Sequence, residues 1–366
     1  MIKFIYPTDG DMITDAALKH TDDGAMLLEI CVESDKAVVV NGVHARLAPD
    51  GRWKAEAAPY VDGTLCARCA GEEASIRVHY LPHAYGKYSL SVDDNIRFLA
   101  DLTLQPRHSL FDHPYLALYK RMHERFGAKV RLNLFYRMDG ITFAQYGAFD
   151  LSMMTDRYRS EFIEHSDWLH LAFHSLQETP AYPYRNASYE EMQRDMQRVE
   201  REIIRFAGEQ TLERATTIHF GQCTAEGVRA LREGGIRELM GFMELDRLGR
   251  PSVSYGLSVE RVLQTQRYGF WKDEKSDMIY GKIDVVMNAH SPRRIVEILE
   301  KQHADHPMRG FVEIMIHEQY FYADYCNYEP DYEERIEEGC RWCQEHGYSG
   351  AFAEEVIEPG TWNRIR

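Results

Sequence analysis

The chain has 366 residues, 44% of them hydrophobic, which predicts one large domain with a smaller one beside it. Its formal charge of −15 argues against a nucleic-acid partner, because such proteins gather Lys and Arg to neutralise phosphates, and it favours neutral or cationic ligands. No stretch approaches the roughly 20 apolar residues of a membrane span, and Pro7 and Asp9 interrupt the N-terminus before a signal-peptide core could form, so a cytoplasmic protein without a membrane partner is expected.

Residues 1–85 are predicted to form a small β-sandwich domain of the immunoglobulin-like kind. Short alternating segments such as 25–32, 52–57 and 63–69 are typical of strands. The turns between strands are marked by Asn41-Gly42, Asp50-Gly51 and Asp62-Gly63, dipeptides that tolerate the positive φ of tight hairpins. Such a module could bind sugar or serve only as structural support, and its alternating aromatic residues favour support.

From residue 86 to residue 366 strands alternate with amphipathic helices, which indicates a parallel β/α architecture. A helix is predicted over 114–126, with Pro114 at its start and Gly127 after its end. A second helix should begin after Ser188, since Glu191 completes a capping-box pattern. Further helical patterns cover 153–164, 224–235 and 333–347.

Charged and imidazole side chains follow the predicted strands. The strand through Val92 runs directly into Asp93 and Asp94, and adjacent carboxylates are poor strand formers that bind a cation, divide acid and base roles or start a turn. The histidines that follow strands are His174, His219, His290 and His317. In a β/α barrel the C-terminal ends of the strands share one mouth, so these side chains are expected to converge there.

The same positions resemble the polysaccharide deacetylases, carbohydrate esterases of family 4 that adopt an irregular β/α barrel, over about residues 87–355. Ser91-Val92-Asp93-Asp94-Asn95 looks like the family's T-F-D-D-G, and Asn133-Leu134-Phe135-Tyr136 looks like its second strand, which often ends in T-F-F. His174-Ser175-Leu176-Gln177-Glu178 is similar to H-[ST]-x-x-H, with glutamate in place of the second histidine. Ile218-His219-Phe220-Gly221-Gln222 stands where the family has R-x-P-Y-G, and Ile316-His317 resembles its late L-H.

The resemblance implies a metal-dependent hydrolase that acts on a carbohydrate-linked amide or ester, with Asp93 as general base and His317 as general acid. Residue chemistry favours Asp94 and His174 as ligands of a divalent ion, most simply Zn²⁺, with Mn, Fe, Ni and Co as alternatives. Glu178 would join them if a helical turn follows His174, whereas Thr179-Pro180 favours an extended loop. His219 competes as a third or fourth ligand.

Candidate substrate-binding residues are Tyr184, His290 and Tyr320. The two tyrosines could equally pack the rim of the barrel, and His290 could bond a turn carbonyl. Two other functions stay open: cleavage of a glycosidic bond by Asp93 and Glu178, and a degenerate barrel that binds sugar without catalysis.

No disulfide bond is predicted among the cysteines. Seven is an odd number, and a chain of this size needs no staples, so reduced thiols are expected. The C-x-x-C pairs Cys66/Cys69 and Cys340/Cys343 fall on a predicted strand and a predicted helix, and this separation argues against a shared zinc site.

Overall fold

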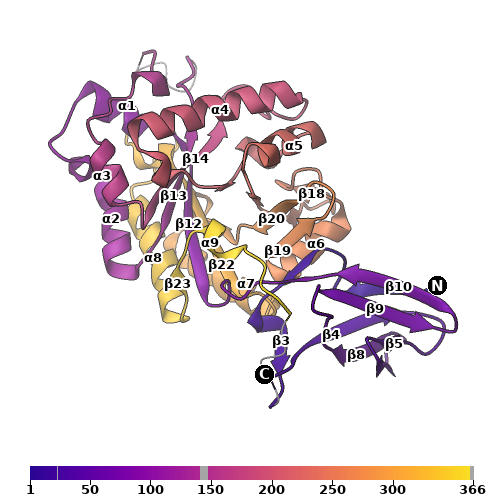
Figure 1. Cartoon of the computed structure of the whole chain (residues 1–366). Coiled ribbons are helices and arrows are strands. Elements are labelled where there is room, and N and C mark those ends of the chain that lie inside the picture. The colour runs from indigo at the N-terminus through magenta and orange to yellow at the C-terminus, as the bar shows by residue number, and fades with distance from the viewer. Residues whose placement is uncertain (23, 141–146, 363–366) are drawn as a thin grey trace.

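A computed structural model describes residues 1–22, 24–140 and 147–362, and it has a mixed α/β fold with parallel sheet and flanking helices (Figure 1). The main sheet has the strand order β14-β13-β12-β22-β21, and β23 also pairs with β12. Every pairing in it is parallel. The strands are β12 (Lys87–Asn95), β13 (Val130–Phe135), β14 (Leu169–Ser175), β21 (Val285–Val286), β22 (Phe311–His317) and β23 (Ser349–Gly350).

Helices cover the main sheet, and their long apolar stripes explain why its strands are buried almost throughout. Figure 1 shows α4 and α5 together along one side and α2 beside α8 on another. The helices are α1 (Arg97–Leu104), α2 (Pro114–Phe126), α3 (Arg159–Glu164), α4 (Tyr189–Phe206), α5 (Ala225–Glu233), α6 (Val259–Tyr268), α7 (Pro292–Asp305), α8 (Tyr332–Glu345) and α9 (Ala353–Val356).

The helix boundaries test the sequence rules. The helix predicted over 114–126 is confirmed, and it ends at Gly127, whose φ of 63° is the left-handed conformation that favours glycine. The start at Ser188 is also confirmed, because its side chain accepts a hydrogen bond from the Glu191 backbone N–H. The helix predicted over 153–164 is wrong in extent: a 3₁₀ turn ends at Met153 and α3 begins only at Arg159.

A second six-stranded sheet has the order β11-β2-β19-β20-β16-β15. Its strands are β2 (Asp11–Ile13), β11 (His79–Tyr80), β15 (Ala215–Thr216), β16 (Glu238–Gly241), β19 (Phe270–Asp273) and β20 (Met278–Lys282). Close to this sheet, a parallel bridge joins Leu171 of β14 to Leu212, three residues before β15. Because β2 and β11 come from the first 85 residues, the N-terminal segment is interleaved with the rest of the chain.

The remaining N-terminal strands form two antiparallel sheets with the orders β1-β4-β8-β7, to which β3 adds, and β10-β9-β5-β6. They are β1 (Lys3–Tyr6), β3 (Leu18–His20), β4 (Met26–Glu33), β5 (Val39–Val40), β6 (Val43–His44), β7 (Arg46–Leu47), β8 (Trp53–Ala57), β9 (Thr64–Cys69) and β10 (Glu72–Arg77). One hydrophobic cluster joins both sheets, for example through Ile30 and Leu65, and it includes Tyr268 and Trp362 from much later in the chain.

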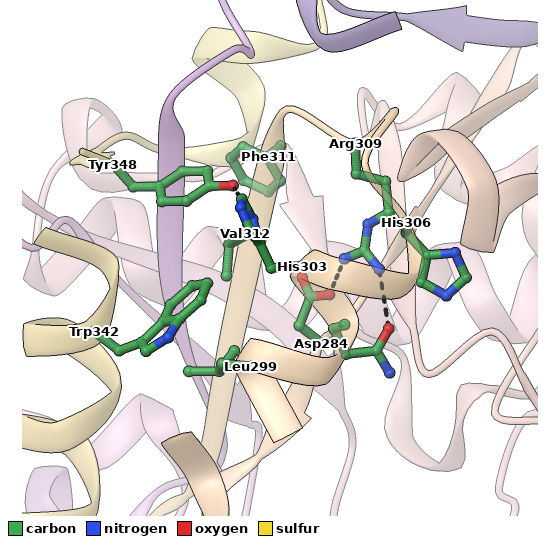
Figure 2. A pocket seen from close by; sticks show the side chains of 10 residues that line it. Asp284, Leu299, His303, His306, Arg309, Phe311, Val312, Trp342 and Tyr348 are labelled. Carbon is green, nitrogen blue, oxygen red and sulfur yellow. Dashed lines mark hydrogen bonds and ion pairs between the residues drawn. The ribbon is translucent and has the colours of Figure 1, made fainter. Parts of the chain in front are cut away.

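A small cavity between α7, α8 and the start of β22 contains a buried ion pair between Asp284 and Arg309 (Figure 2). Its volume of about 10 Å³ corresponds to one water molecule. Asp284 also accepts a 2.9 Å hydrogen bond from the Glu313 backbone N–H. We interpret this pocket as a structural anchor for β22.

The cysteine thiols are all free, and five of the seven are buried. Cys66 and Cys69 lie on β9, while Cys340 and Cys343 lie on α8. In the part of the chain that the structure describes, no helix combines the length and the apolar character that crossing a bilayer requires.

Candidate metal centre

The site begins where β12 ends. Asp93 and Asp94 are both buried, with 2% and 3% of their surface exposed, and Asp94 has a φ of 64°. The ladder to β13 is irregular between Val92 and Asn95, so the strand bulges at the two carboxylates. A buried carboxylate held in the left-handed region costs conformational energy, and such residues concentrate at functional sites.

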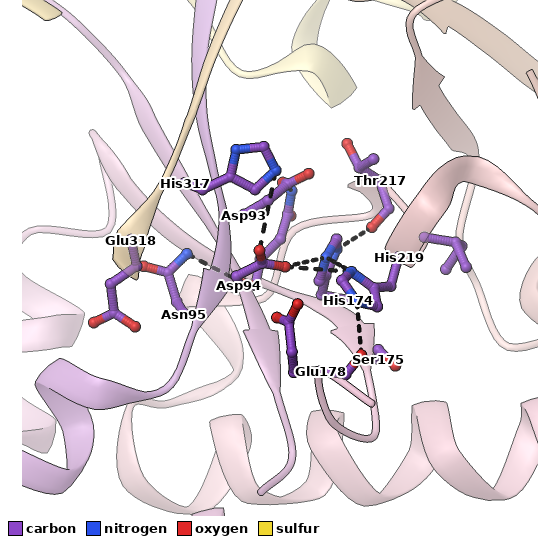
Figure 3. A network of polar contacts seen from close by, with 12 residues as sticks. Asp93, Asp94, Asn95, His174, Ser175, Glu178, Thr217, His219, His317 and Glu318 are labelled. Carbon is purple, nitrogen blue, oxygen red and sulfur yellow. Dashed lines mark hydrogen bonds and ion pairs between the residues drawn. The ribbon is translucent and has the colours of Figure 1, made fainter. Parts of the chain in front are cut away.

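Three side chains from three strand ends meet around one point (Figure 3). Asp94 Oδ1 lies 3.0 Å from His174 Nε2 and 3.3 Å from His219 Nδ1. The two imidazole nitrogens are 3.1 Å apart. Ligands of one small cation are separated by roughly 3 Å, so this triangle has the size of one face of a coordination shell.

The outer nitrogens of both imidazoles are fixed by backbone carbonyl oxygens. His174 Nδ1 lies 2.5 Å from the Thr217 oxygen, and His219 Nε2 lies 3.1 Å from the Glu178 oxygen. Each of these nitrogens therefore carries a proton and donates it. The inner nitrogens can then bind an ion through their lone pairs or, when protonated, donate to Asp94. This is the arrangement that orients histidines at metal sites.

Charges in the cluster are strongly coupled. Burial acts to raise the pKa of Asp94, but hydrogen bonds from His174 and His219 outweigh it and hold that pKa well below its usual range. Burial acts to lower the pKa of His174, but the charges of Asp93 and Asp94 prevail and raise it to about 9. The proton on His174 therefore offsets the negative charge of the aspartates, and a bound cation could take over this role.

Glu178 also faces the cluster, although the helical-turn argument for it is wrong. Residues 176–180 form an irregular, bent loop without a helical turn. Figure 3 shows the Glu178 carboxylate turned toward Asp94, and burial together with the charge of Asp94 raises the pKa of Glu178 to about 8. Its Oε2 atom is buried without a partner among the described residues. A divalent cation would satisfy that oxygen and remove the repulsion between the carboxylates, so the donor set fits such an ion.

The two residues assigned to proton transfer lie on neighbouring strands, since Asp93 and His317 are direct partners in the β12–β22 ladder. Asp93 Oδ1 accepts a 2.5 Å hydrogen bond from Asn133 Nδ2. His317 Nδ1 lies 2.8 Å from Asn288 Oδ1, and its Nε2 lies 4.0 Å from Asp94 Oδ2. The structure thus brings together all six residues expected for catalysis and metal binding: Asp93, Asp94, His174, Glu178, His219 and His317.

The candidate substrate residues are distributed differently. Tyr184 is 1% exposed and its hydroxyl accepts a hydrogen bond from the Leu176 backbone, so a substrate contact for Tyr184 is wrong. His290 is half-buried after a 3₁₀ turn, and among the described residues it forms no hydrogen bond or ion pair with the cluster. Tyr320 is half-buried with its ring 6.1 Å from that of His317, and it remains at the edge of the site.

Two residues next to His317 support the site and were not predicted. Gln319 Nε2 donates a 2.7 Å hydrogen bond to Asp94 Oδ2. The Glu318 carboxylate accepts from the backbone N–H groups of Ile96, Arg97 and Phe98 at the start of α1. Both follow a strand-ending histidine in the sequence, a position that could have indicated them.

A second group with suitable donors consists of His170, Glu213 and Glu354. His170 Nδ1 lies 2.6 Å from Glu213, whose other oxygen accepts from the Glu354 backbone N–H, and Glu354 accepts from the Arg214 backbone N–H. The His170 ring stacks on Phe352 at 3.6 Å. Because these groups satisfy one another, we interpret them as structural.

No protein-family model matches the chain, and no curated protein is similar to it. Similar solved structures include a CE4 family pseudoenzyme from Bacillus anthracis, at 10% identity over 88% of this chain and 91% of that chain, with a TM-score of 0.38. A family 4 acetyl xylan esterase from Clostridium thermocellum, in complex with a cobalt ion, is 9% identical over 74% and 89%, with a TM-score of 0.38. A 4-alpha-glucanotransferase from Thermococcus litoralis is 13% identical over 75% and 41%, with a TM-score of 0.44.

Proposed function

We propose that this protein is a metal-dependent hydrolase that releases an acyl group from a carbohydrate-linked amide or ester. The observation that carries the proposal is the triangle of Asp94, His174 and His219, whose donor atoms lie 3.0 to 3.3 Å apart with both outer imidazole nitrogens fixed. The carbohydrate part of the proposal rests on the motif resemblance.

The ion would be held by Asp94, His174 and His219. Glu178 would supply a fourth ligand or partly neutralise the charge of the ion. A divalent ion bound there would polarise the acyl carbonyl and make a water molecule more acidic. Zn²⁺ suits imidazole and carboxylate ligands, while the second carboxylate favours harder ions such as Mn²⁺ or Fe²⁺.

Asp93 would act as the general base. Its Oδ1 is held by Asn133, which fixes the carboxylate and leaves Oδ2 to take a proton from the attacking water. Asp93 is adjacent to Asp94 on β12, but among the described residues it belongs to no cluster of possible metal ligands. Its proposed role is therefore proton transfer alone.

His317 would act as the general acid. Its Nδ1 donates to Asn288 Oδ1, so Nε2 on the Asp94 side is the atom that would deliver a proton to the leaving nitrogen or oxygen. The side chain is 26% exposed, which gives a substrate access to that nitrogen.

The test is release of acetate from acetylated amino-sugar oligomers by the purified protein, with Zn²⁺, Mn²⁺ or Co²⁺ supplied in turn. We expect turnover that EDTA abolishes and that re-added metal restores. Asp93→Asn serves as the catalytic control. Oligomer binding without acetate release under every metal would instead support the non-catalytic carbohydrate-binding function, and shortened oligomers would support glycosidic cleavage.

A further inference from the structure

Two aromatic side chains project into solvent beside the metal cluster. Tyr182 is 42% exposed and Phe220 is 36% exposed, although large aromatic rings are usually buried. Their ring centroids are 4.6 Å apart with an angle of 41° between the planes. Phe220 follows His219 directly, and those two rings are 4.3 Å apart. A continuous row of rings therefore leads outward from the candidate metal ligand.

Both residues adopt a backbone conformation that their side chains disfavour. Tyr182 has a φ of 57° and Phe220 has a φ of 62°, the left-handed region that favours glycine. Local packing imposes this geometry at Phe220. Tyr255 accepts a hydrogen bond from the Ile218 backbone with its hydroxyl and donates one to the Gly221 oxygen with its own N–H.

The pair borders a polar surface groove of about 410 Å³, lined by Arg185, Gln222 and Ser254 among others. The Arg185 guanidinium lies 5.0 Å from the Tyr182 ring centre and donates a 2.9 Å hydrogen bond to Gln222. Arg185 thus packs over one face of the Tyr182 ring, and the exposed parts of Tyr182 and Phe220 are left for a ligand.

We propose that Tyr182 and Phe220 form a subsite that binds the ring carrying the scissile acyl group, through the apolar face of that ring. This inference rests on the proposed hydrolase function and extends it to the substrate's shape. A pyranose and an arene share the required chemistry, a ring with a face of C–H groups or π electrons, which packs on an aromatic side chain. Glycine would fit both backbone positions with less strain, so the presence of an aromatic side chain at each favours a role for the rings.

The decisive variants are Tyr182→Gly and Phe220→Gly, because each removes a ring and relieves the backbone at the same time. If the rings bind substrate, each variant should raise KM for an acetylated amino-sugar oligomer about 2- to 10-fold. The value of kcat/KM should fall less for a small acyclic acetyl ester than for the oligomer. The thermal midpoint should hold or rise by about 2 °C, since strain is removed. If the rings are structural, the midpoint falls in both variants and the proposal is overturned.

Two further measurements separate this inference from the hydrolase proposal. NMR titration with the oligomer, and separately with 4-nitrophenol, reports ring binding without turnover. Weaker binding of either ligand by both glycine variants supports the subsite and identifies the kind of ring, whether or not acetate is released. Unchanged binding of both ligands overturns it. The metal content of both glycine variants should match that of the wild type. The matched control is Tyr60→Ala, which removes a tyrosine that is 49% exposed in the loop between β8 and β9.

Discussion

Gln319 Nε2 donates a 2.7 Å hydrogen bond to Asp94 Oδ2, which leaves Oδ1 as the only Asp94 oxygen that faces His174 and His219. Gln319 is 6% exposed and lies in the 3₁₀ turn that follows β22, 225 residues away in sequence. The bond selects one oxygen of Asp94 for the cluster, so Gln319 is a positioning residue for the proposed ion.

Gln319→Leu should therefore weaken metal binding. We expect the dissociation constant for Zn²⁺ to rise about 10- to 100-fold, because an outer-shell hydrogen bond to a ligand is lost. Competition with a chromogenic chelator measures this constant. Gln344→Leu, a similar change at an exposed position on α8, is the control and should leave the constant unchanged. Equal affinities in wild type and Gln319→Leu would show that Gln319 does not position the ligand.

The two adjacent aspartates should respond differently to the same change. Asp93→Asn should retain the ion but lose about 10²-fold or more in rate, the scale of a lost general base. Asp94→Asn should lose both the ion and the activity, because a neutral amide replaces a negatively charged ligand. Metal quantification beside acetate release separates the two outcomes. If Asp93→Asn also loses the ion, the division of roles is wrong.

Glu178 should make metal affinity depend on pH. Burial and the charge of Asp94 raise its pKa to about 8, so a proton competes with the ion below that pH. Affinity in the wild type should increase as the pH rises from about 6 through 8, and Glu178→Gln should bind more weakly with a flatter profile. Isothermal titration at several pH values tests this, and parallel profiles for the two proteins would remove Glu178 from the site.

Asp11 should make the free energy of unfolding decrease as the pH rises, whereas the metal affinity increases with pH. Burial raises its pKa to about 7, against the lowering effect of hydrogen bonds from Thr8 and the charge of Arg261. The folded state keeps this proton longer than the unfolded chain, so the contribution is complete below about pH 4 and is lost as the pH rises through 7.

Asp11→Asn cannot lose a proton, so it isolates the effect. The unfolding free energy of the wild type minus that of the variant should fall by up to about 4 kcal/mol between pH 4 and pH 8. Urea unfolding across this range is the measurement. A constant difference would mean that Asp11 is ionised in the folded protein.

Sequence reasoning located the cluster because the chemistry lies at strand ends. Asp94, His174 and His317 each follow a segment of apolar residues, and parallel strands bring such positions to one edge. It failed where position depends on a loop. Glu178 reaches the cluster from an irregular loop, and no i, i+4 rule describes that approach.

Contacts between distant segments also could not be predicted from the sequence. Gln319 and Asn133 act through hydrogen bonds to residues 225 and 40 positions away, and no local pattern encodes such pairings. The strand Asp11–Ile13 pairs with Phe270–Asp273, whereas hairpin signals predict only neighbours in the chain. The φ of 62° at Phe220 likewise has no local sequence signal, because phenylalanine is not a residue that favours the left-handed region.

The most direct test of the central claim is the metal content of the purified protein after incubation with Zn²⁺ and gel filtration, measured by mass spectrometry beside Asp94→Ala, with His290→Ala as a control histidine outside the cluster. The account predicts about one ion per chain in the wild type and in His290→Ala, and almost none in Asp94→Ala. A wild type without bound metal, or an Asp94→Ala variant that binds as much as the wild type, would contradict it.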